Sequence, residues 1–465
     1  MDESCTVEGR RRVELNPVLI VFGLLVAAML LTHIVPAGRF DRNGTQVVAG
    51  SYRPVPKVNG LPALISTSIP SPTDTPAKAA GVLALFKAIP AGMSLANNLI
   101  FMVMFVGGTF GILRATGVID AGVDRLLHLT SGNRYLLAGG LLIVLASGST
   151  FLGFSSEYVA LIPLVLELGR RLNLPNLFAP AIVATADFIG YNASVTNPIA
   201  LGVAQPLAGV PMFSGLVPRL LVFGVMLGLS VIYLMIYLRR QPKVEHVPEA
   251  TRLGTRQLGV LLALVLGGAV LVIGTGRWSW HTPELAAAFI ALGILFAAVA
   301  GLRPSAAAEA FLDGMRTMLL PCLLIGVAGG IGIMLQASQV LDSIVQAIAI
   351  SIDGRSSGMV AMGLMIAEMG FGVIIPSVSA KAAVSLPILT PIAHLSGVSG
   401  QVTVSAVLLG SGITNMVTPT NPLLLAFLAA ARVDYRDWLR FIAPLAAACF
   451  ITGLAAIYLM TVTGW

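Results

Sequence analysis

The sequence predicts an all-α polytopic membrane protein with about nine transmembrane helices and two re-entrant hairpins, arranged in two repeats of inverted topology. Hydrophobic residues make up 56% of the chain, charged residues only 11%, and the mean hydropathy is +0.90. The apolar runs recur at roughly the 20-residue length of a helix that crosses a bilayer. Because a soluble chain carries roughly 25% charged residues, the composition excludes an ordinary soluble domain.

Two of the apolar runs are interrupted by an Asn-Pro pair, at Asn197-Pro198 and at Asn421-Pro422. Proline removes a backbone hydrogen bond and ends or kinks a helix. Irregular backbone at bilayer depth is tolerated only where it is buried in protein or lines a water-filled cavity. Paired interruptions in corresponding positions of two halves point to the binding site of a secondary transporter, and we predict that class of function.

The N-terminal part is predicted to comprise a cytoplasmic segment (1–14), a first span (15–35) and an external loop (36–90). Three arginines precede the first span, and the positive-inside rule places them in the cytoplasm. The loop is rich in Pro, Gly, Ser and Thr, so we expect it to be largely irregular, with an interfacial helix near residues 79–89.

The remainder is predicted to form two repeats and a connection. The apolar stretch 135–168 has a polar centre and is too short for two crossings of roughly 20 residues each, which indicates a re-entrant hairpin. The predicted segments are repeat 1 at 91–238 with hairpin 135–168 and broken helix 178–205, a cytoplasmic linker at 239–256, two connecting spans at 257–301, and repeat 2 at 305–460 with hairpin 357–395 and broken helix 401–431.

An internal repeat supports these divisions. Segment 107–120 aligns without gaps on segment 329–342, and the Thr-Asn-Pro triplet at 196–198 aligns on that at 420–422 after a shift of two residues. With the basic clusters in the cytoplasm, the first copy begins outside and the second inside, and the C-terminus is external. Inverted repeats bring both hairpin tips and both helix breaks together near the bilayer midplane.

Four ionisable side chains lie within the predicted spans or tips: Glu157, Asp187, Glu368 and Lys381. A charge at the bilayer centre is costly, so such residues usually face a cavity and find a partner. Lys381 could bind a substrate carboxylate or neutralise one of the three carboxylates. Glu157 or Asp187 could carry a coupling proton or bind a substrate amino group, and oxygen atoms at the helix breaks could instead hold Na⁺.

The candidate residues are polar side chains at the two tips and the two breaks. The substrate-binding candidates are Ser155, Ser156, Glu157, Asn192, Thr196, Asn197, Ser377, Ser379, Lys381, Thr414, Asn415, Thr420 and Asn421. The ion-coupling candidates are Ser149, Thr150, Glu157, Asp187, Asn197, Ser411 and Asn421. We expect no resident cofactor or metal, and the coupling ion is left open between Na⁺ and H⁺.

Other classes of function fit less well. The chain has no HExxH, GxSxG or P-loop motif, so we do not expect an enzyme. An ion channel has no need of hairpins in inverted copies. The net charge of +7 lies in short clusters between apolar runs, which indicates loop topology and no nucleic-acid partner.

Several stretches, spread over nearly the whole chain, carry a resemblance to a known family: 36–40, 107–122, 197–198 with 202–205, and 414–415 with 418–420. In them the chain resembles the DcuC-like family of anaerobic four-carbon dicarboxylate carriers, in its YfcC-type branch within the ion transporter superfamily. The resemblance implies a homodimer in which a scaffold holds a mobile transport domain of hairpins and broken helices, with elevator-type alternating access. It also implies a dicarboxylate or a basic amino acid as substrate.

The chain departs from that family pattern at three places. Ser156 stands beside Glu157 where the family usually has adjacent acidic residues, Ser411 lies where it tends to have Asp, and Lys381 takes a place often held by a neutral polar residue. We therefore predict a secondary active transporter of a small carboxylate-bearing metabolite, a dicarboxylate or an amino acid, in the lipid bilayer of the cytoplasmic (inner) membrane. The alternatives are a basic amino-acid antiporter of the arginine/ornithine type and the permease subunit of a binding-protein-dependent system.

Overall fold

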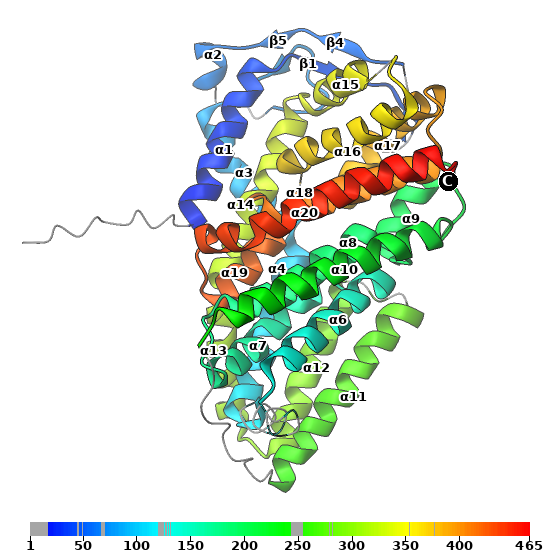
Figure 1. Ribbon diagram of the computed structural model, residues 1–465. Helices are drawn as coiled ribbons and strands as arrows, with labels where there is room; N and C mark the ends of the chain where they lie inside the picture. Colours follow the sequence, from blue (N-terminus) through cyan, green and yellow to red (C-terminus); the bar gives the residue numbers. More distant parts are fainter. Residues whose placement is uncertain are drawn as a thin grey trace, which may run out of the picture.

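The computed structural model describes residues 17–43, 46–48, 50–66, 70–119, 125, 128, 130, 132–242, 254–278, 280, 282–352, 354–375 and 377–465. Almost all of the described chain is helical (Figure 1). Within it, eight helices are long and apolar enough to cross a membrane, which confirms the predicted all-α polytopic class. The predicted cytoplasmic segment 1–14 and most of the linker 239–256 lie outside the described residues.

The N-terminal part holds one apolar helix and three small β pairings, at the upper end in Figure 1. Its elements are α1 (Pro17–Ile34), β1 (Ala37–Arg39), β2 (Arg42–Asn43), β3 (Gln46–Val47), β4 (Arg53–Val55), β5 (Lys57–Val58), α2 (Leu61–Leu64) and β6 (Ala77–Lys78). β1 pairs with β4 and β2 with β3 in antiparallel fashion, whereas β5 and β6 are parallel. Strands of two or three residues are too short to leave an alternating pattern, so the expectation of irregular backbone did not include them.

The helices after this part divide into two series joined by α11 (Thr255–Arg277) and α12 (Thr282–Ala300). The first series is α3 (Val82–Leu95), α4 (Asn97–Ala115), α6 (Arg134–Leu152), the 3₁₀ helix η1 (Ser156–Leu161), α7 (Ile162–Arg171), α8 (Phe178–Ala193), α9 (Pro198–Leu207) and α10 (Leu216–Arg239). The second is α13 (Pro304–Thr317), α14 (Leu319–Ala337), α15 (Leu341–Ile352), α16 (Ser357–Ile374), α17 (Val378–Leu395), α18 (Gly400–Val417), α19 (Pro422–Ala431) and α20 (Tyr435–Val462).

The two series have matching helix bounds. Both ends of α3 lie 222 positions before those of α13 (82 to 304 and 95 to 317), and the same offset relates α4 to α14. Both ends of α9 lie 224 positions before those of α19 (198 to 422 and 207 to 431). Because α6 and α16 still end 222 positions apart, the two extra residues of the second series lie after these helices.

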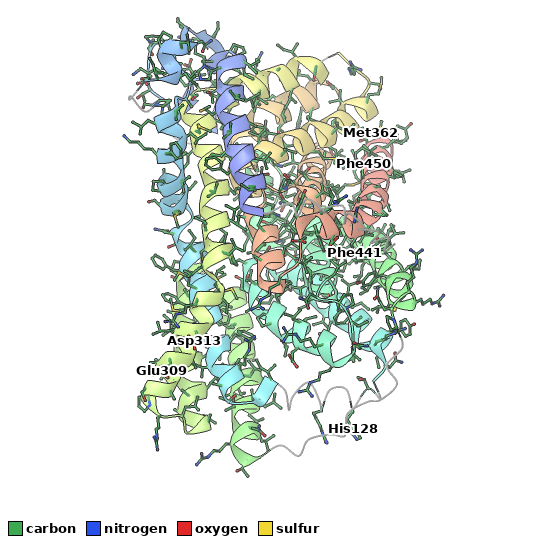
Figure 2. The ribbon with its side chains drawn as sticks, turned by 90° about the vertical axis from the view of Figure 1, so that its left-hand side faces the viewer. His128, Glu309, Asp313, Met362, Phe441 and Phe450 are labelled. Carbon is green, nitrogen blue, oxygen red and sulfur yellow. The ribbon has the colours of Figure 1, made fainter. Side chains whose placement is uncertain are left out.

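The packing is reciprocal as well. α3 lies along α14, and α4 lies along α13. The consecutive helices α3 and α4 run in the direction opposite to α13 and α14, with Asp313 of α13 toward the lower end in Figure 2. α6 packs on α8 as α16 packs on α18, and the broken helices α8 and α18 contact each other. The interruptions of both halves are thereby gathered in the centre of the molecule.

The structure differs from the sequence prediction in the segment 79–89. Instead of a short interfacial helix, the chain forms the 14-residue α3, which packs closely along α14 and leads almost directly into α4. A Cβ atom at Gly92 would lie 2.1 Å from the carbonyl oxygen of Gly326 and 2.4 Å from the nitrogen of Gly330. Glycine therefore permits backbone-to-backbone packing of α3 on α14.

The segment between α1 and α3 is attached to the second series. The backbone N–H of Phe40 donates to Asp342 Oδ2 (3.0 Å), and that of Gly38 donates to the Gln339 carbonyl (3.0 Å). Gln339 Nε2 in turn donates to the carbonyl oxygen of Asp74 (2.7 Å). These bonds join the small β pairings to the turn between α14 and α15.

Candidate functional site

The first helix break separates α8 from α9. α8 ends at Ala193, the residue after it, Ser194, adopts the left-handed conformation (φ 42°), and α9 begins at Pro198. The Oδ1 atom of Asn197 accepts hydrogen bonds from the backbone N–H groups of Ile199 and Ala200, both at 3.0 Å. Asn at the N-cap and Pro at the first helical position are the residues that start a helix best, so the sequence itself places the break here.

The end of α6 closes over this break through hydrogen bonds. Thr196 Oγ1 donates to the carbonyl oxygen of Phe151 (3.1 Å), Asn197 Nδ2 donates to that of Ser149 (3.3 Å), and the Val195 N–H donates to Thr150 Oγ1 (3.1 Å). The last turn of a helix has carbonyl groups without partners in the helix, and here the broken helix supplies those partners.

The second break repeats these contacts. Asn421 Oδ1 accepts from the Leu423 N–H (3.0 Å), and Thr420 Oγ1 donates to the carbonyl oxygen of Val373 (2.8 Å). Val373 is the next-to-last residue of α16, as Phe151 is of α6, so both threonines bind the same place on equivalent helices. The two breaks therefore share the asparagine cap and the threonine bond, whereas Asn197 Nδ2 donates to the Ser149 carbonyl and Asn421 Nδ2 to the Asn415 carbonyl.

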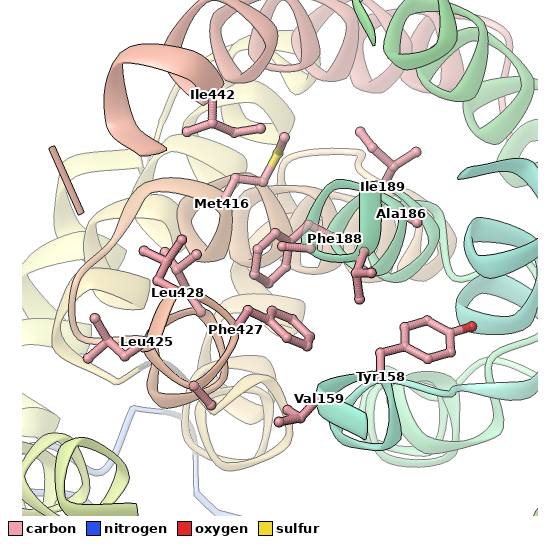
Figure 3. Close-up of a cluster of buried hydrophobic side chains, with 14 of the residues drawn as sticks. Tyr158, Val159, Ala186, Phe188, Ile189, Met416, Leu425, Phe427, Leu428 and Ile442 are labelled. Carbon is pink, nitrogen blue, oxygen red and sulfur yellow. The ribbon is translucent and has the colours of Figure 1, made fainter. Parts of the chain in front are cut away.

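The broken helices cross where a glycine meets an asparagine. A Cβ atom at Gly412 would lie 1.4 Å from Asn192 Oδ1, so only glycine leaves room for that side chain. Asn192 Oδ1 is buried and has no hydrogen-bond partner in the described structure. It borders a small cavity of about 10 Å³, enough for about one water molecule. Phe188 of α8 and Phe427 of α19 pack edge to face with ring centroids 6.3 Å apart (Figure 3).

Two carboxylates lie together at the first break. Asp187 is 1% exposed, and Ser149 Oγ lies 2.9 Å from its carbonyl oxygen and 3.4 Å from Oδ1. The Ser155 side chain also contacts Asp187, and Glu157 Oε2 accepts from the Ser155 N–H (2.9 Å). In the described part of the chain, no basic side chain forms an ion pair with Asp187 or Glu157.

The second break holds an ion pair instead. Lys381 Nζ lies 3.6 Å from Glu368 Oε2 and donates to the carbonyl oxygen of Glu368 (3.2 Å), and both side chains are 1% exposed. A Cβ at Gly372 would lie 2.9 Å from Lys381 Nζ and 3.2 Å from Thr414 Cβ, so this glycine makes the space that the amine occupies. Of the three carboxylates that the sequence offered Lys381, the structure pairs it with Glu368.

Most of the other candidate side chains form hydrogen bonds with backbone carbonyl oxygens. Thr414 Oγ1 lies 3.0 Å from the carbonyl oxygens of both Met369 and Gly410, Ser411 Oγ donates to that of Val407 (2.6 Å), and Asn421 Nδ2 donates to that of Asn415 (3.1 Å). Their donors are occupied, unlike the buried acceptors Asn192 Oδ1 and Asn415 Oδ1, which have no partner in the described structure. Ser156 and Ser377 lie at the two tips, and the side chain of Ser379 lies outside the described atoms.

Sequence reasoning missed the two glycines at the centre of the site. Gly372 and Gly412 make the space for Lys381 and Asn192, yet the chain contains 49 glycines and nothing in the sequence sets these two apart. Sequence reasoning also missed a groove of about 380 Å³ between α4, α7 and α13, which is lined by Arg114, Pro163 and Asp313 among others. No cluster of three or more metal-ligating side chains occurs among the described residues.

The chain is similar to known proteins along nearly its whole length. Residues 16–462 match the model of the DcuC family, described as C4-dicarboxylate anaerobic carrier. The Escherichia coli (strain K12) protein named "Putative basic amino acid antiporter YfcC" is 29% identical over 484 aligned residues, which cover 95% of each chain. A Haemophilus influenzae protein is 23% identical over 395 residues, 80% of this chain and 77% of that protein.

Among the solved structures that match are two with 16% sequence identity and a TM-score of 0.46 each. The YdaH transporter of Alcanivorax borkumensis matches over 97% of this chain and 99% of its own, and its structure is described as having an unusual topology. MtrF of Neisseria gonorrhoeae, described with a class of antimetabolite efflux pumps, matches over 96% and 95%.

Proposed function

The chain belongs to the DcuC family of C4-dicarboxylate anaerobic carriers and is a membrane transporter, and from this membership we propose that it is a secondary active carrier of a small carboxylate-bearing metabolite. It works in the cytoplasmic (inner) membrane by alternating access. Of the two substrate classes, we infer an amino acid in preference to a dicarboxylate.

The inference rests on how charge is distributed between the two breaks. Of the described basic side chains, Lys381 is the one at the two breaks that could have bound a second substrate carboxylate, and Glu368 already neutralises it. Asp187 and Glu157, in contrast, have no basic partner in the described structure. A buried carboxylate without a counter-charge is costly, so these two favour a ligand that brings positive charge, either a substrate amino group or a coupling cation.

The matching halves support the mechanism. We propose that α6 to α9 and α16 to α19 form the mobile domain of an elevator, and that the antiparallel pairs α3–α4 and α13–α14 belong to the scaffold of a homodimer. The reciprocal packing of α3 on α14 and α4 on α13 is what inverted repeats across a membrane require. The N-terminus is then cytoplasmic and the C-terminus external. Transport is coupled to Na⁺ or H⁺, or it proceeds by exchange of one substrate molecule for another.

Transport by the purified chain in liposomes tests the substrate class. We expect accumulation of labelled basic or neutral amino acid and loss of that accumulation in Asp187→Asn, which keeps the shape of the side chain and removes its charge. Ser396→Ala, at the residue that follows α17, serves as a control substitution outside the two breaks. Accumulation of four-carbon dicarboxylates alone would contradict the amino-acid assignment.

A basic amino-acid antiporter is the second candidate, favoured by the pair of carboxylates at the first break. In that case uptake of arginine occurs only into liposomes preloaded with a second basic amino acid. Concentrative uptake by this chain alone would exclude a permease subunit, because such a subunit needs its partner proteins.

A further inference from the structure

Three buried polar side chains meet at one small cavity beside the crossing of the broken helices. The cavity has a volume of about 10 Å³ and is bordered by Asn192 of α8, Arg219 of α10 and Ser405 of α18. These residues are 1%, 3% and 4% exposed. Asn192 Oδ1, Arg219 Nε and Ser405 Oγ have no hydrogen-bond partner among the described atoms. Because a buried polar group without a partner is costly, three of them at one cavity indicate a ligand.

The charge at this cavity is positive. The guanidinium group of Arg219 donates through Nη1 to the carbonyl oxygen of Ser214 (2.8 Å) and through Nη2 to Gln401 Oε1 (2.9 Å). Both acceptors are neutral, and no acidic side chain in the part of the chain that the structure describes forms an ion pair with Arg219. Arg219 also lies in the first turn of α10, at the positive end of the helix dipole. Since a buried charge normally has a partner of opposite sign, the cavity favours an anion over a water molecule.

The size and the donors of the cavity select a small anion. A volume of about 10 Å³ holds about one water molecule. Chloride is only slightly larger than water, whereas a carboxylate attached to a substrate does not fit. The Nε–H group of Arg219 and the hydroxyl group of Ser405 can both donate to the ion. A half turn of the Asn192 amide adds Nδ2 as a third donor and gives up only its weak contact with Met416 Sδ (3.8 Å).

We propose that this cavity is a chloride site, in which Arg219, Ser405 and the amide of Asn192 hold one ion between α8, α10 and α18. The ion neutralises the buried guanidinium group and joins both broken helices to α10. Its ligand is an inorganic anion, so this inference is independent of which substrate the protein carries.

The unfolding temperature of the full-length purified protein tests the site, measured in NaCl and in sodium gluconate of equal ionic strength. Sodium is common to both salts and gluconate is too large for the cavity, so the difference reports the binding of chloride. We expect the wild type to unfold at a temperature higher by about 2 °C or more in NaCl, because chloride binds the folded state. Equal unfolding temperatures in the two salts would show that the cavity takes water only, and would overturn the proposal.

Two substitutions locate the response. Ser405→Ala removes one donor to the ion, so the chloride concentration that gives half of the stabilisation should rise at least about tenfold. Arg219→Gln removes the charge and should abolish the stabilisation. The matched controls lie on α10: the hydroxyl group of buried Ser230 already donates to the carbonyl oxygen of Met226 (2.7 Å), and Arg239 is exposed. Ser230→Ala and Arg239→Gln should respond to chloride as the wild type does.

An unchanged response in Ser405→Ala, or the same loss in Ser230→Ala, would place the chloride effect elsewhere and contradict the proposal. This comparison still decides the matter if Arg219→Gln is not recovered folded. Bromide gives a direct check, because it replaces chloride and scatters anomalously. In crystals of the wild type grown in NaBr, an anomalous peak should lie between Arg219 and Ser405, and a cavity without that peak would refute the site.

Discussion

Replacing Gly330 by alanine tests whether α3 is an integral part of the bundle. A Cβ atom at Gly330 would lie 2.6 Å from the carbonyl oxygen of Ala88 and 2.9 Å from its carbonyl carbon, whereas ordinary contacts of this kind lie at 3.4–4 Å. Both clashing atoms belong to the backbone, so no side-chain rotation relieves them and α3 must move away by roughly 1 Å. A gap of that size forfeits up to about half of the dispersion energy across the contact.

Gly332 offers a matched control two residues along the same helix, because a Cβ there meets nothing within 4 Å. Overpacking in Gly330→Ala should lower the free energy of unfolding by about 1–3 kcal/mol. Both variants gain about 0.5–1 kcal/mol from the better helix propensity of alanine. Gly332→Ala should thus be neutral or more stable than wild type, and Gly330→Ala less stable than Gly332→Ala by about 1–3 kcal/mol.

The assay is unfolding of the detergent-purified variants, by temperature and by denaturing detergent, followed by intrinsic fluorescence. If Gly330→Ala and Gly332→Ala shift the unfolding midpoint alike, the close packing of α3 on α14 is refuted. The predicted interfacial position of the segment 79–89 would then be the better description.

Three further outcomes are expected. Thr420→Val should lower the free energy of unfolding by about 1–2 kcal/mol, more than Thr196→Val, because Thr420 is buried and its bond with Thr418 is shielded from solvent, whereas the bond of Thr196 is exposed; an equal loss in both variants would speak against this. Gly412→Ala should destabilise by about 1–3 kcal/mol, and adding Asn192→Ala should relieve much of that loss, measured as a double-mutant cycle; simple additivity would contradict the contact. Burial lowers the pKa of Lys57 to about 8 in the folded protein, so the unfolded state binds more protons than the folded state between pH 8 and 10.5. The free energy of unfolding should therefore rise with pH across that window. The Lys57→Met variant should lose this rise, measured by the unfolding temperature at each pH.

The sequence alone determined where the helices break. Pro198 and Pro422 cannot continue a helix from the preceding turn, and the asparagines before them cap the helix that follows. These are local effects of a few neighbouring residues, so they can be predicted without the fold. The presence of long apolar helices followed in the same way from the length of the apolar runs, and eight such helices occur among the described residues.

Only the tertiary structure decided which partners the polar groups take. The sequence offered Lys381 three carboxylates, and the choice of Glu368 depends on α16 and α17 folding back around a tip where Gly372 leaves room. The segment 79–89 was likewise predicted as an interfacial helix because it follows a polar loop, and it is the glycine contact with α14 that places α3 within the bundle. Such choices depend on distances between residues far apart in the chain, and no local propensity records those distances.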